Sequence, residues 1–324
     1  MLIKRDETFV SVIIPNYNHS YFLEQRIESI LHQTFQDFEL ILLDDCSTDN
    51  SREILSKYAT HPKVSQVVLN EKNSGSTFAQ WDKGISLATG DFIWIAESDD
   101  SCELNFLEKL VDVHLKHPEV ALVYCQSHRI NSSGEITGNW ITHTLQFGNF
   151  FTEDFIMDGN KFIESYLIHK NVIPNVSGVL FKRDDLLKIT PLIFEPYMKY
   201  YADWFYYIQL LCNSKIGFIS DSLNYFRHHD KSVIGMAEKK SGWLEIFKME
   251  LRGREKMLHY LQKCKPSNLD TIRQQSEIGS RQLRYLTAKG FIQRGETIRG
   301  FLLVRKYPFL LKRLSRFYKE KLFN

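Results

Sequence analysis

Predicted buried strands and amphipathic helices alternate along the first hundred residues of the chain. Hydrophobic runs, rich in β-branched and aromatic residues, stand at residues 9–14, 38–43, 64–69 and 92–96. Between them, apolar residues recur at intervals of three and four, which is the spacing of a helix that buries one face. Strands that alternate with helices form a mostly parallel sheet, so the sequence predicts a Rossmann-like α/β fold flanked by helices.

Each of the four predicted strands is followed by a polar segment. Residues 16–18 follow the first strand, 44–47 the second and 97–100 the fourth, and Gly75 lies in the loop after the third. In open α/β sheets, ligands bind beyond the carboxyl ends of the strands. We therefore expect these segments to share one rim of the sheet and to form a binding site.

The segment after the fourth strand, Glu97-Ser98-Asp99-Asp100, carries three carboxylates within four residues. Carboxylates at this spacing repel one another unless a cation or hydrogen-bond donors lie among them. Such oxygen ligands suit Mg²⁺ or Mn²⁺, which bind one or two carboxylates together with the phosphates of a substrate. Alternatively, Ser98 and Asp99 cap a helix that begins near Leu104, and the cluster by itself is compatible with both interpretations.

Four motifs, in their order and spacing, carry a family resemblance. They are Val10-Ser11-Val12-Ile13-Ile14-Pro15-Asn16-Tyr17-Asn18, Glu39-Leu40-Ile41-Leu42-Leu43-Asp44-Asp45-Cys46-Ser47-Thr48-Asp49, Asn73-Ser74-Gly75, and Ala88-Thr89-Gly90-Asp91 leading to Glu97-Ser98-Asp99-Asp100. The chain resembles the family 2 glycosyltransferases with the GT-A fold, of the bacterial polysaccharide and O-antigen type. The resemblance is close over residues 9 to about 110 and extends more weakly to about 235.

The resemblance implies a metal-dependent enzyme that binds a nucleoside-diphosphate sugar. Tyr17 would stack on the base, Asp45 would accept a hydrogen bond from the base, and Glu97 would approach the ribose. The residues assigned to the nucleotide sugar in this way are Pro15, Asn16, Tyr17, Asp45, Gly75, Glu97, Asp99 and Arg227. Those assigned to a divalent metal, Mn²⁺ or Mg²⁺, are Asp99, Asp100 and His229, and relatives differ in which aspartate is the direct ligand.

Asp203 is the candidate catalytic base that the resemblance implies. Residues 200–205 fall where the family carries an Asp, commonly preceded by Glu, at the start of a helix, and here Ala202 stands in place of that Glu. Asp203 would take the proton of the acceptor hydroxyl while that hydroxyl displaces the nucleoside diphosphate directly from C1 of the sugar, with inversion. The alternative is that Asp203 caps the helix before an aromatic core stripe.

Residues 223–232 resemble the family segment that closes over the diphosphate. In that register Arg227 and His229 would face phosphate or metal, since Arg is a natural phosphate partner and His a common metal ligand. The competing interpretation is that His228 and His229 form a surface pair with no role. Residues 175–178 stand where relatives line the acceptor side, although a plain loop would look the same.

The resemblance also implies the reaction class. The donor would be a nucleoside-diphosphate sugar, with uridine the commonest base in the family. The acceptor would be a hydroxyl of a glycan or of a lipid-linked saccharide in cell-surface polysaccharide synthesis. A nucleotidyltransferase and a non-catalytic module that binds nucleotide sugars are the alternatives, whereas no GxGxxG motif follows the first strand to indicate a dinucleotide-binding dehydrogenase.

We expect a GT-A catalytic domain over residues 1–235, with a nucleotide-binding half at about 1–110 and an acceptor half at about 111–235. Residues 236–324 should form a basic α-helical extension, because from Gly242 onward only helical periodicity remains. The stretch 131–159 is rich in Gly, Asn and Thr, and we expect it to form loops over the site.

The end of the chain is strongly basic. Residues 284–324 contain eleven Lys or Arg and two Glu. Within them, residues 309–319 place apolar side chains on one helical face and basic ones on another. Such a helix can lie on the anionic cytoplasmic face of the inner membrane. Packing of its apolar face on the catalytic domain, or on a second subunit of a homo-oligomer, is equally compatible with the pattern.

The cysteine spacing and the N-terminal residues indicate in which cellular compartment the protein lies. The five cysteines are odd in number and include no CxxC pair, which indicates neither a disulfide framework nor a zinc site. The first residues lack the apolar core of a signal peptide, and no apolar run approaches the ~20 residues of a membrane-spanning helix. We therefore expect a cytoplasmic protein, and its acidic body indicates no nucleic-acid partner.

Overall fold

The computed structural model describes residues 9–192, 198, 201–229 and 242–323. The expected domain boundary near residue 235, residues 230–232 of the segment around His229, and residue 200 before the candidate base lie outside these ranges. The chain divides into two compact units. The sheet unit comprises Met1–Phe162, Asn171–Phe194 and Gln209–His229, and the helical unit comprises Ile163–Lys170, Glu195–Ile208 and Asp230–Asn324.

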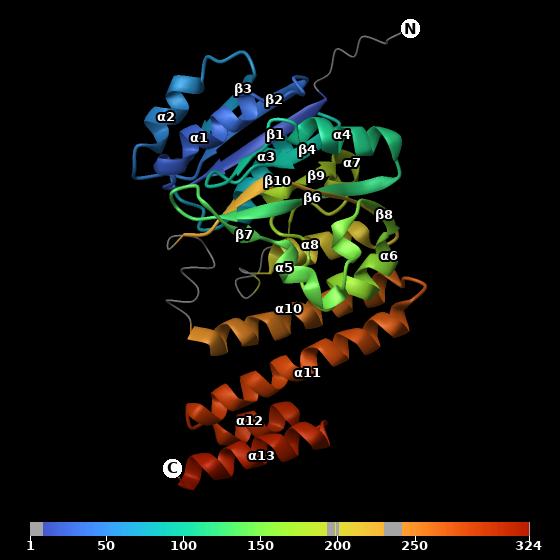
Figure 1. Cartoon of the computed structure of the whole chain (residues 1–324). Coiled ribbons are helices and arrows are strands. Elements are labelled where there is room, and N and C mark those ends of the chain that lie inside the picture. The colour runs from blue at the N-terminus through green and yellow to red at the C-terminus, as the bar shows by residue number, and fades with distance from the viewer. Residues whose placement is uncertain (1–8, 193–197, 199–200, 230–241, 324) are drawn as a thin grey trace. The chain divides into compact units, whose positions relative to one another are not determined.

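The first four strands of the sheet unit form the parallel sheet that the sequence predicts (Figure 1). β1 (Val10–Asn16) lies between β2 (Phe38–Asp44) and β4 (Phe92–Ile95) and pairs with both in parallel, and β3 (Val64–Leu69) pairs in parallel with β2. The helices that connect them are α1 (Ser20–Leu31), α2 (Ser51–Tyr58) and α3 (Thr77–Leu87). All residues of β1, β2 and β4 are buried, as expected for strands covered on both faces.

Beyond β4 the sheet becomes mixed. β9 (Val179–Lys182) runs antiparallel to both β4 and β6 (Val120–Ile130), and β6 pairs in parallel with β10 (Lys215–Arg227). Within the described residues the strands form one ten-stranded sheet in the order β3-β2-β1-β4-β9-β6-β10-β5, with β7 beside β6 and β8 beside β10. The other elements of the unit include β5 (Ser101–Cys102), α4 (Phe106–Lys116), β7 (Ile136–Asn139), α5 (Ile141–Thr144), β8 (Phe155–Asp158), α6 (Gly159–Phe162) and α7 (Arg183–Leu187).

The prediction that residues 131–159 form only loops is wrong. This stretch contains β7, α5 and β8, and β8 pairs antiparallel with β10. The rings of Phe151 and Phe155 lie 5.8 and 5.1 Å from the ring of Phe218 on β10. These aromatic contacts are made with residues more than sixty positions away, so the local Gly, Asn and Thr content does not reveal them.

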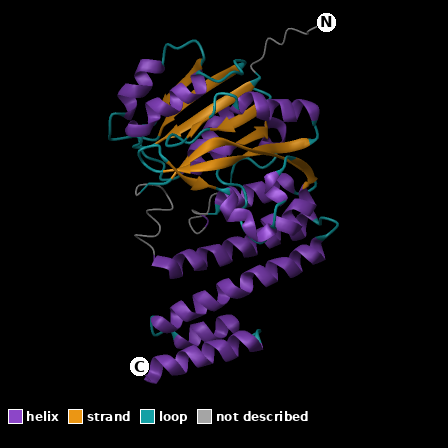
Figure 2. Ribbon diagram, viewed as in Figure 1, coloured by secondary structure: helices purple, strands orange, loops and turns teal. Residues whose placement is uncertain are grey.

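Helices cover both faces of the sheet (Figure 2). On one face, α1 and α4 bury Leu23 and Phe106 in the same apolar core as Val12 of β1. On the other face, α3 approaches β1 so closely that a Cβ on Gly84 would lie 2.3 Å from Cγ2 of Ile13. Close packing on both faces holds the carboxyl end of β1 in place, and the candidate binding rim starts there.

The helical unit is built mainly from α10 (Gly242–Cys264), α11 (Leu269–Gln293), α12 (Thr297–Val304) and α13 (Pro308–Phe323). It also contains residues 163–170 and the first part of α8 (Ala202–Leu211). Arg254 of α10 donates hydrogen bonds to the carbonyl oxygens of Ile168 at 2.9 Å and His169 at 2.7 Å. Its guanidinium also lies over the Trp204 ring, 4.8 Å from the centroid. One buried cation therefore joins three segments of this unit.

The apolar face of α13 packs within the helical unit. Leu310 and Leu314 are buried in a cluster with Tyr285, Ile292 and Val304 of α11 and α12. The basic side chains of the same helix, Lys312, Arg313, Arg316 and Lys319, remain exposed. The tail helix therefore uses its apolar face for packing, and no helix among the described residues combines the length and hydrophobicity needed to cross a bilayer.

Candidate active site

The carboxyl ends of β1 and β2 are tied together by side-chain hydrogen bonds. Nδ2 of Asn16 donates to Oδ1 of Asp44 at 3.1 Å and to Oγ of Ser47 at 3.2 Å. Because β1, β2 and β4 are parallel neighbours, the polar segments that follow them lie at one edge of the sheet, as predicted. Tyr17, next in sequence, is 46% exposed and is therefore available to a ligand.

Asp45 organises the loop that follows β3. Its carboxylate accepts hydrogen bonds from the backbone N–H of Ser74 at 2.9 Å, from Nδ2 of Asn70 at 2.7 Å and from Nε2 of Gln80 at 2.9 Å. Gly75, in the same loop, has φ +73°, a conformation that side chains disfavour. The structure thus gives Asp45 a role in positioning this loop, and its contact with a base remains a prediction.

Glu97 begins the acidic turn after β4 and faces α3. Its Oε1 accepts a hydrogen bond from Nε1 of Trp81 at 2.7 Å, and its backbone N–H donates to Oγ of Ser177 at 3.1 Å. Ser177 belongs to the segment 175–178 that the resemblance places at the acceptor side. Segments 80 residues apart in sequence therefore meet at Glu97.

Asp100 and Arg227 brace the acidic turn against the end of β10. One oxygen of Asp100 accepts from the backbone N–H of Arg227 at 2.8 Å and the other from Nδ2 of Asn175 at 2.6 Å. Arg227 is buried, and its Nε donates to the carbonyl of Asp99 at 2.6 Å. Its two terminal nitrogens donate to the carbonyl of Asn131 and to the side chain of Gln25. The phosphate contact implied for Arg227 remains a prediction, since all three of its nitrogens have protein acceptors here.

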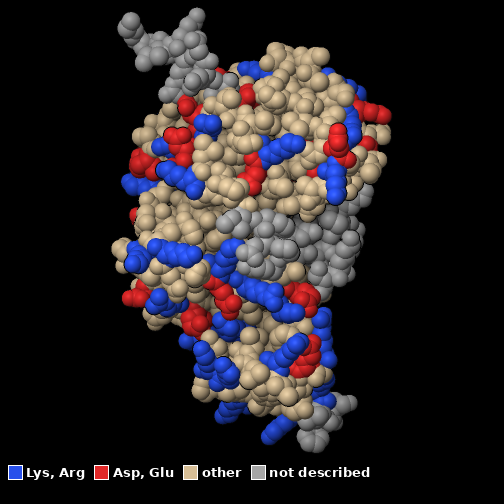
Figure 3. Space-filling view, turned by 180° about the vertical axis from the view of Figure 1, so that it is seen from behind, with Lys and Arg blue, Asp and Glu red and all other residues tan. Residues whose placement is uncertain are grey.

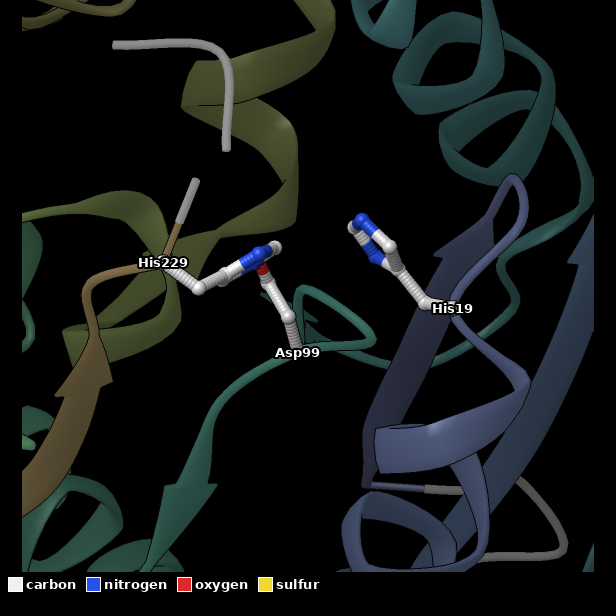
Figure 4. A group of neighbouring side chains, drawn as sticks. All are labelled: His19, Asp99 and His229. Atoms are coloured by element: carbon white, nitrogen blue, oxygen red, sulfur yellow. The ribbon is translucent and has the colours of Figure 1, made fainter. Parts of the chain in front are cut away.

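His19, Asp99 and His229 form a group of possible metal ligands (Figure 4). One ligand atom from each residue can be chosen so that all three lie within 4.8 Å of one another. Nε2 of His229 lies 3.0 Å from Oδ2 of Asp99, and Nδ1 of His19 lies 2.8 Å from Oγ of Ser98. Two of the three predicted metal ligands are thus brought together, whereas Asp100 is outside the group.

His19 was not among the site residues predicted from the sequence. It follows β1 directly after the Pro15 to Asn18 motif, so its place on the predicted rim was the available signal. A single His in a polar loop is more often a surface residue than a ligand. Only the approach of the chain after β4 and the end of β10 identifies it as part of a candidate metal centre.

The three carboxylates of the turn differ in their protonation. Burial and the negative charge of Asp99 raise the pKa of Glu97 to about 8 and also raise the pKa of Asp100. Burial acts to raise the pKa of Asp99 as well, but the hydrogen bond from His229 and the nearby His19 hold it below its ordinary value. Asp99 is therefore the carboxylate that stays ionised at neutral pH, and it faces the two histidines.

Asp203, the candidate base, lies in the helical unit. It occupies the first turn of α8, which begins at Ala202, so it stands inside the helix and not before its first residue. It is half-buried, whereas its sequence neighbours Ala202 and Trp204 are buried. Its role as a base remains a prediction.

Comparison with known proteins gives three findings. Residues 11–168 match the model of the family described as glycosyl transferase family 2. A glycosyltransferase of Haemophilus influenzae that is called uncharacterized is 31% identical over 179 residues, which covers 54% of this chain and 68% of that protein. The putative teichuronic acid biosynthesis glycosyltransferase TuaG of Bacillus subtilis is 38% identical over 103 residues, which covers 32% of this chain and 40% of that protein.

The fold also matches a solved structure. The crystal structure of S. aureus TarS 1-349 in complex with UDP-GlcNAc superposes with a TM-score of 0.61 and 17% sequence identity. The match covers 95% of this chain and 92% of that one. It shows that the two chains share a fold.

Proposed function

The chain belongs to glycosyl transferase family 2 and is a glycosyltransferase with the GT-A fold; we propose that it transfers a sugar with inversion of configuration at C1. In the proposed reaction the acceptor oxygen bonds to C1 of the sugar while the bond from C1 to the nucleoside diphosphate breaks. The acceptor is a hydroxyl of a glycan or lipid-linked saccharide in cell-surface polysaccharide synthesis. The similarity to a putative teichuronic acid biosynthesis enzyme supports this acceptor class.

The observation that carries the proposal is the His19, Asp99 and His229 group at the carboxyl edge of the sheet. Two imidazoles and one ionised carboxylate fit a divalent transition metal, and imidazole ligands favour Mn²⁺ over Mg²⁺, which prefers oxygen. Asp100 supports the group indirectly, because it fixes the backbone of Arg227 two residues before His229. A divalent ion at such a site stabilises the negative charge that the departing diphosphate gains.

The donor proposed for this rim is a UDP-sugar. Tyr17 offers an exposed ring for stacking on a base; Pro15 and Asn16 end β1 directly before it, and Gly75 lies in the loop that follows β3. Glu97, held by Trp81, is proposed to contact the ribose. TarS, which shares the fold, binds UDP-GlcNAc, and this supports uridine as the base.

Asp203 is the proposed base. In this role its carboxylate receives the proton of the acceptor hydroxyl as the new bond to C1 forms, so no covalent intermediate is required. The proposed catalytic domain spans residues 1–235, and the extension at 236–324 is basic. Because α13 buries its apolar face, we propose that any contact of this extension with the cytoplasmic membrane surface is electrostatic and comes from its exposed Lys and Arg residues.

A thermal-shift screen tests the donor site. UDP-, GDP- and dTDP-sugars are added with and without Mn²⁺, and a specific ligand at a hundred times its Kd adds about 2.7 kcal/mol of stability. We expect a UDP-sugar to raise Tm in a Mn²⁺-dependent way and Asp99→Asn to abolish that dependence. A complete screen without any metal-dependent shift would refute the proposal.

A transfer assay tests Asp203. Asp203→Asn should keep the donor-induced shift in Tm and lose transfer by about 10²-fold or more, because it removes the proton acceptor. The matched control is Asp184→Asn, which changes an exposed aspartate in the first turn of α7. Near-normal transfer by Asp203→Asn would assign the base elsewhere.

Vesicle sedimentation tests the membrane contact. The full chain should sediment with anionic vesicles at low salt and dissociate as salt is raised, because electrostatic attraction is screened. Charge-neutral Gln substitutions at Lys312 and Arg316 should weaken sedimentation. Binding that is unaffected by salt, or by these substitutions, would contradict an electrostatic contact.

A further inference from the structure

A pocket in the helical unit shares no lining residue with the candidate active site. It has a volume of about 840 Å³ and lies among α10, α11, α12 and the turn that follows α12. Its lining consists of Glu255, Glu277, Arg284, Phe291, Arg299, Leu302, Leu303, Arg305, Lys306 and Tyr307. This volume is within the range of sites that hold small molecules.

Positive charge exceeds negative charge in this pocket. Four of the lining residues are Lys or Arg and two are Glu. The carboxylate of Glu277 accepts a hydrogen bond from the hydroxyl of Tyr307, and that of Glu255 lies 3.9 Å from a terminal nitrogen of Arg284. The acidic groups are therefore occupied by contacts inside the pocket wall.

Part of the positive charge has no counterpart in the described part of the chain. Arg305 and Lys306 are exposed and have neither an ion pair nor a side-chain hydrogen bond there. Nε of Arg284 is buried without a hydrogen-bond partner among the same residues. Lys and Arg side chains also gather over the surface of the helical unit in the lower part of Figure 3. The side chains of Arg305 and Lys306 and Nε of Arg284 can therefore donate hydrogen bonds to a bound anion.

The pocket also has an apolar side. Phe291, Leu302 and Leu303 line it. Leu302 is 52% exposed, and Ile298, one turn earlier on α12, is 77% exposed. The apolar lining thus continues onto an uncovered stripe of α12, next to the cationic side chains.

We propose that this pocket binds an amphiphile with a phosphate or diphosphate head. The head contacts Arg284, Arg305 and Lys306, since guanidinium groups bind phosphate oxygens through paired, charge-assisted hydrogen bonds. The apolar part lies on Phe291 and Leu302. A saccharide carried on such a phosphate is an acceptor for the transfer; this last step rests on the proposed function, whereas the binding does not.

Calorimetric titration of the full chain with farnesyl diphosphate, below the concentration at which it forms micelles, tests the proposal. Arg305→Gln together with Lys306→Gln should weaken binding by about tenfold or more, because hydrogen bonds to charged groups are the stronger ones. The matched control is Lys57→Gln together with Lys116→Gln, which removes the same charge from exposed positions on α2 and α4. We expect the control to change the Kd by less than about twofold.

Two further titrations separate the parts of the ligand. Inorganic pyrophosphate should bind more weakly than farnesyl diphosphate, and farnesol should not bind measurably. The proposal is overturned if the wild-type chain does not bind farnesyl diphosphate, if both double variants lose equal affinity, or if pyrophosphate binds as tightly as the amphiphile. The UDP-sugar and Mn²⁺ thermal shift, measured in the same variants, shows separately whether the donor site is intact.

Discussion

Replacing Glu97 by Gln should stabilise the metal-free protein at neutral pH. The pKa of Glu97 is raised from 4.5 to about 8, first by burial and then by the charge of Asp99. Between these two values the folded state holds a proton that the unfolded state releases. The stability of the wild-type protein therefore falls as pH rises through this window, by about 1.36 kcal/mol per pH unit.

Glu97→Gln removes a group whose proton binding destabilises the folded protein as pH rises. At pH 7, which is 2.5 units above the pKa of Glu97 in the unfolded state, the free energy of unfolding of the wild-type protein is about 3 kcal/mol lower than below pH 4.5 because of this group. Gln resembles the protonated acid and keeps an oxygen to accept the hydrogen bond from Trp81. Glu97→Gln avoids the loss, so its Tm should rise by about 4–5 °C at pH 7 and change little near pH 4.5, because a chain of 324 residues has a large unfolding entropy.

Thermal unfolding in the presence of a chelator, at pH 5 and pH 7, measures the difference. Glu24→Gln is the control, because Glu24 is exposed on α1 and its replacement should change stability by less than about 0.5 kcal/mol. Adding Mn²⁺ should narrow the gap between the wild-type protein and Glu97→Gln, since a cation near Asp99 favours the ionised form of Glu97. A gain of equal size at both pH values would show that packing, and not ionisation, is responsible.

Three other substitutions have defined outcomes. His19→Ala should weaken Mn²⁺ binding roughly ten- to hundredfold in a thermal-shift titration. The control His32→Ala, at an exposed position, should leave Mn²⁺ binding unchanged. If the two variants bind Mn²⁺ with equal affinity, His19 is not a metal ligand. Gly90→Ala should lower the free energy of unfolding by about 1–3 kcal/mol in urea, because its Cβ would lie 2.7 Å from the backbone nitrogen of Ser11, and a neutral result would mean that this turn can relax. Burial lowers the pKa of His114 to about 4, so between pH 6.5 and 4 the unfolded state binds a proton that the folded state excludes. His114→Gln should therefore reduce the loss of folding stability between these pH values by about 3 kcal/mol. An unchanged dependence of the urea midpoint on pH would contradict this.

The sequence was sufficient to predict the parallel part of the sheet and its rim. Strand type and order depend there on local hydrophobic runs, and parallel pairing places Asn16, Asp45 and Glu97 at the same edge. The mixed half of the sheet was harder to predict. Strand β10 extends from Lys215 to Arg227 through register shifts, and its alternation is interrupted at those points.

The site residues differ in how far sequence could assign them. Asp99 and His229 are 130 residues apart, and only the family motif suggested that they meet. His19 required the folded chain, because its proximity to Asp99 depends on how two loops approach each other. Arg227 was assigned to phosphate by its motif, whereas the hydrogen bonds that occupy its guanidinium are made largely to backbone carbonyls, which no sequence pattern marks.

The cation at Arg254 also bears on the order in which the protein folds during synthesis. Arg254 binds the carbonyl of His169, which the ribosome makes 85 residues earlier, and packs on Trp204 beside the candidate base Asp203. At translation rates of about 5–20 residues per second, this delay is roughly 4–17 s. Strands β1, β2 and β4, whose carboxyl ends form the candidate binding rim, are synthesised well before then. A nascent chain should therefore acquire the candidate binding rim first and order the segment that carries the candidate base last.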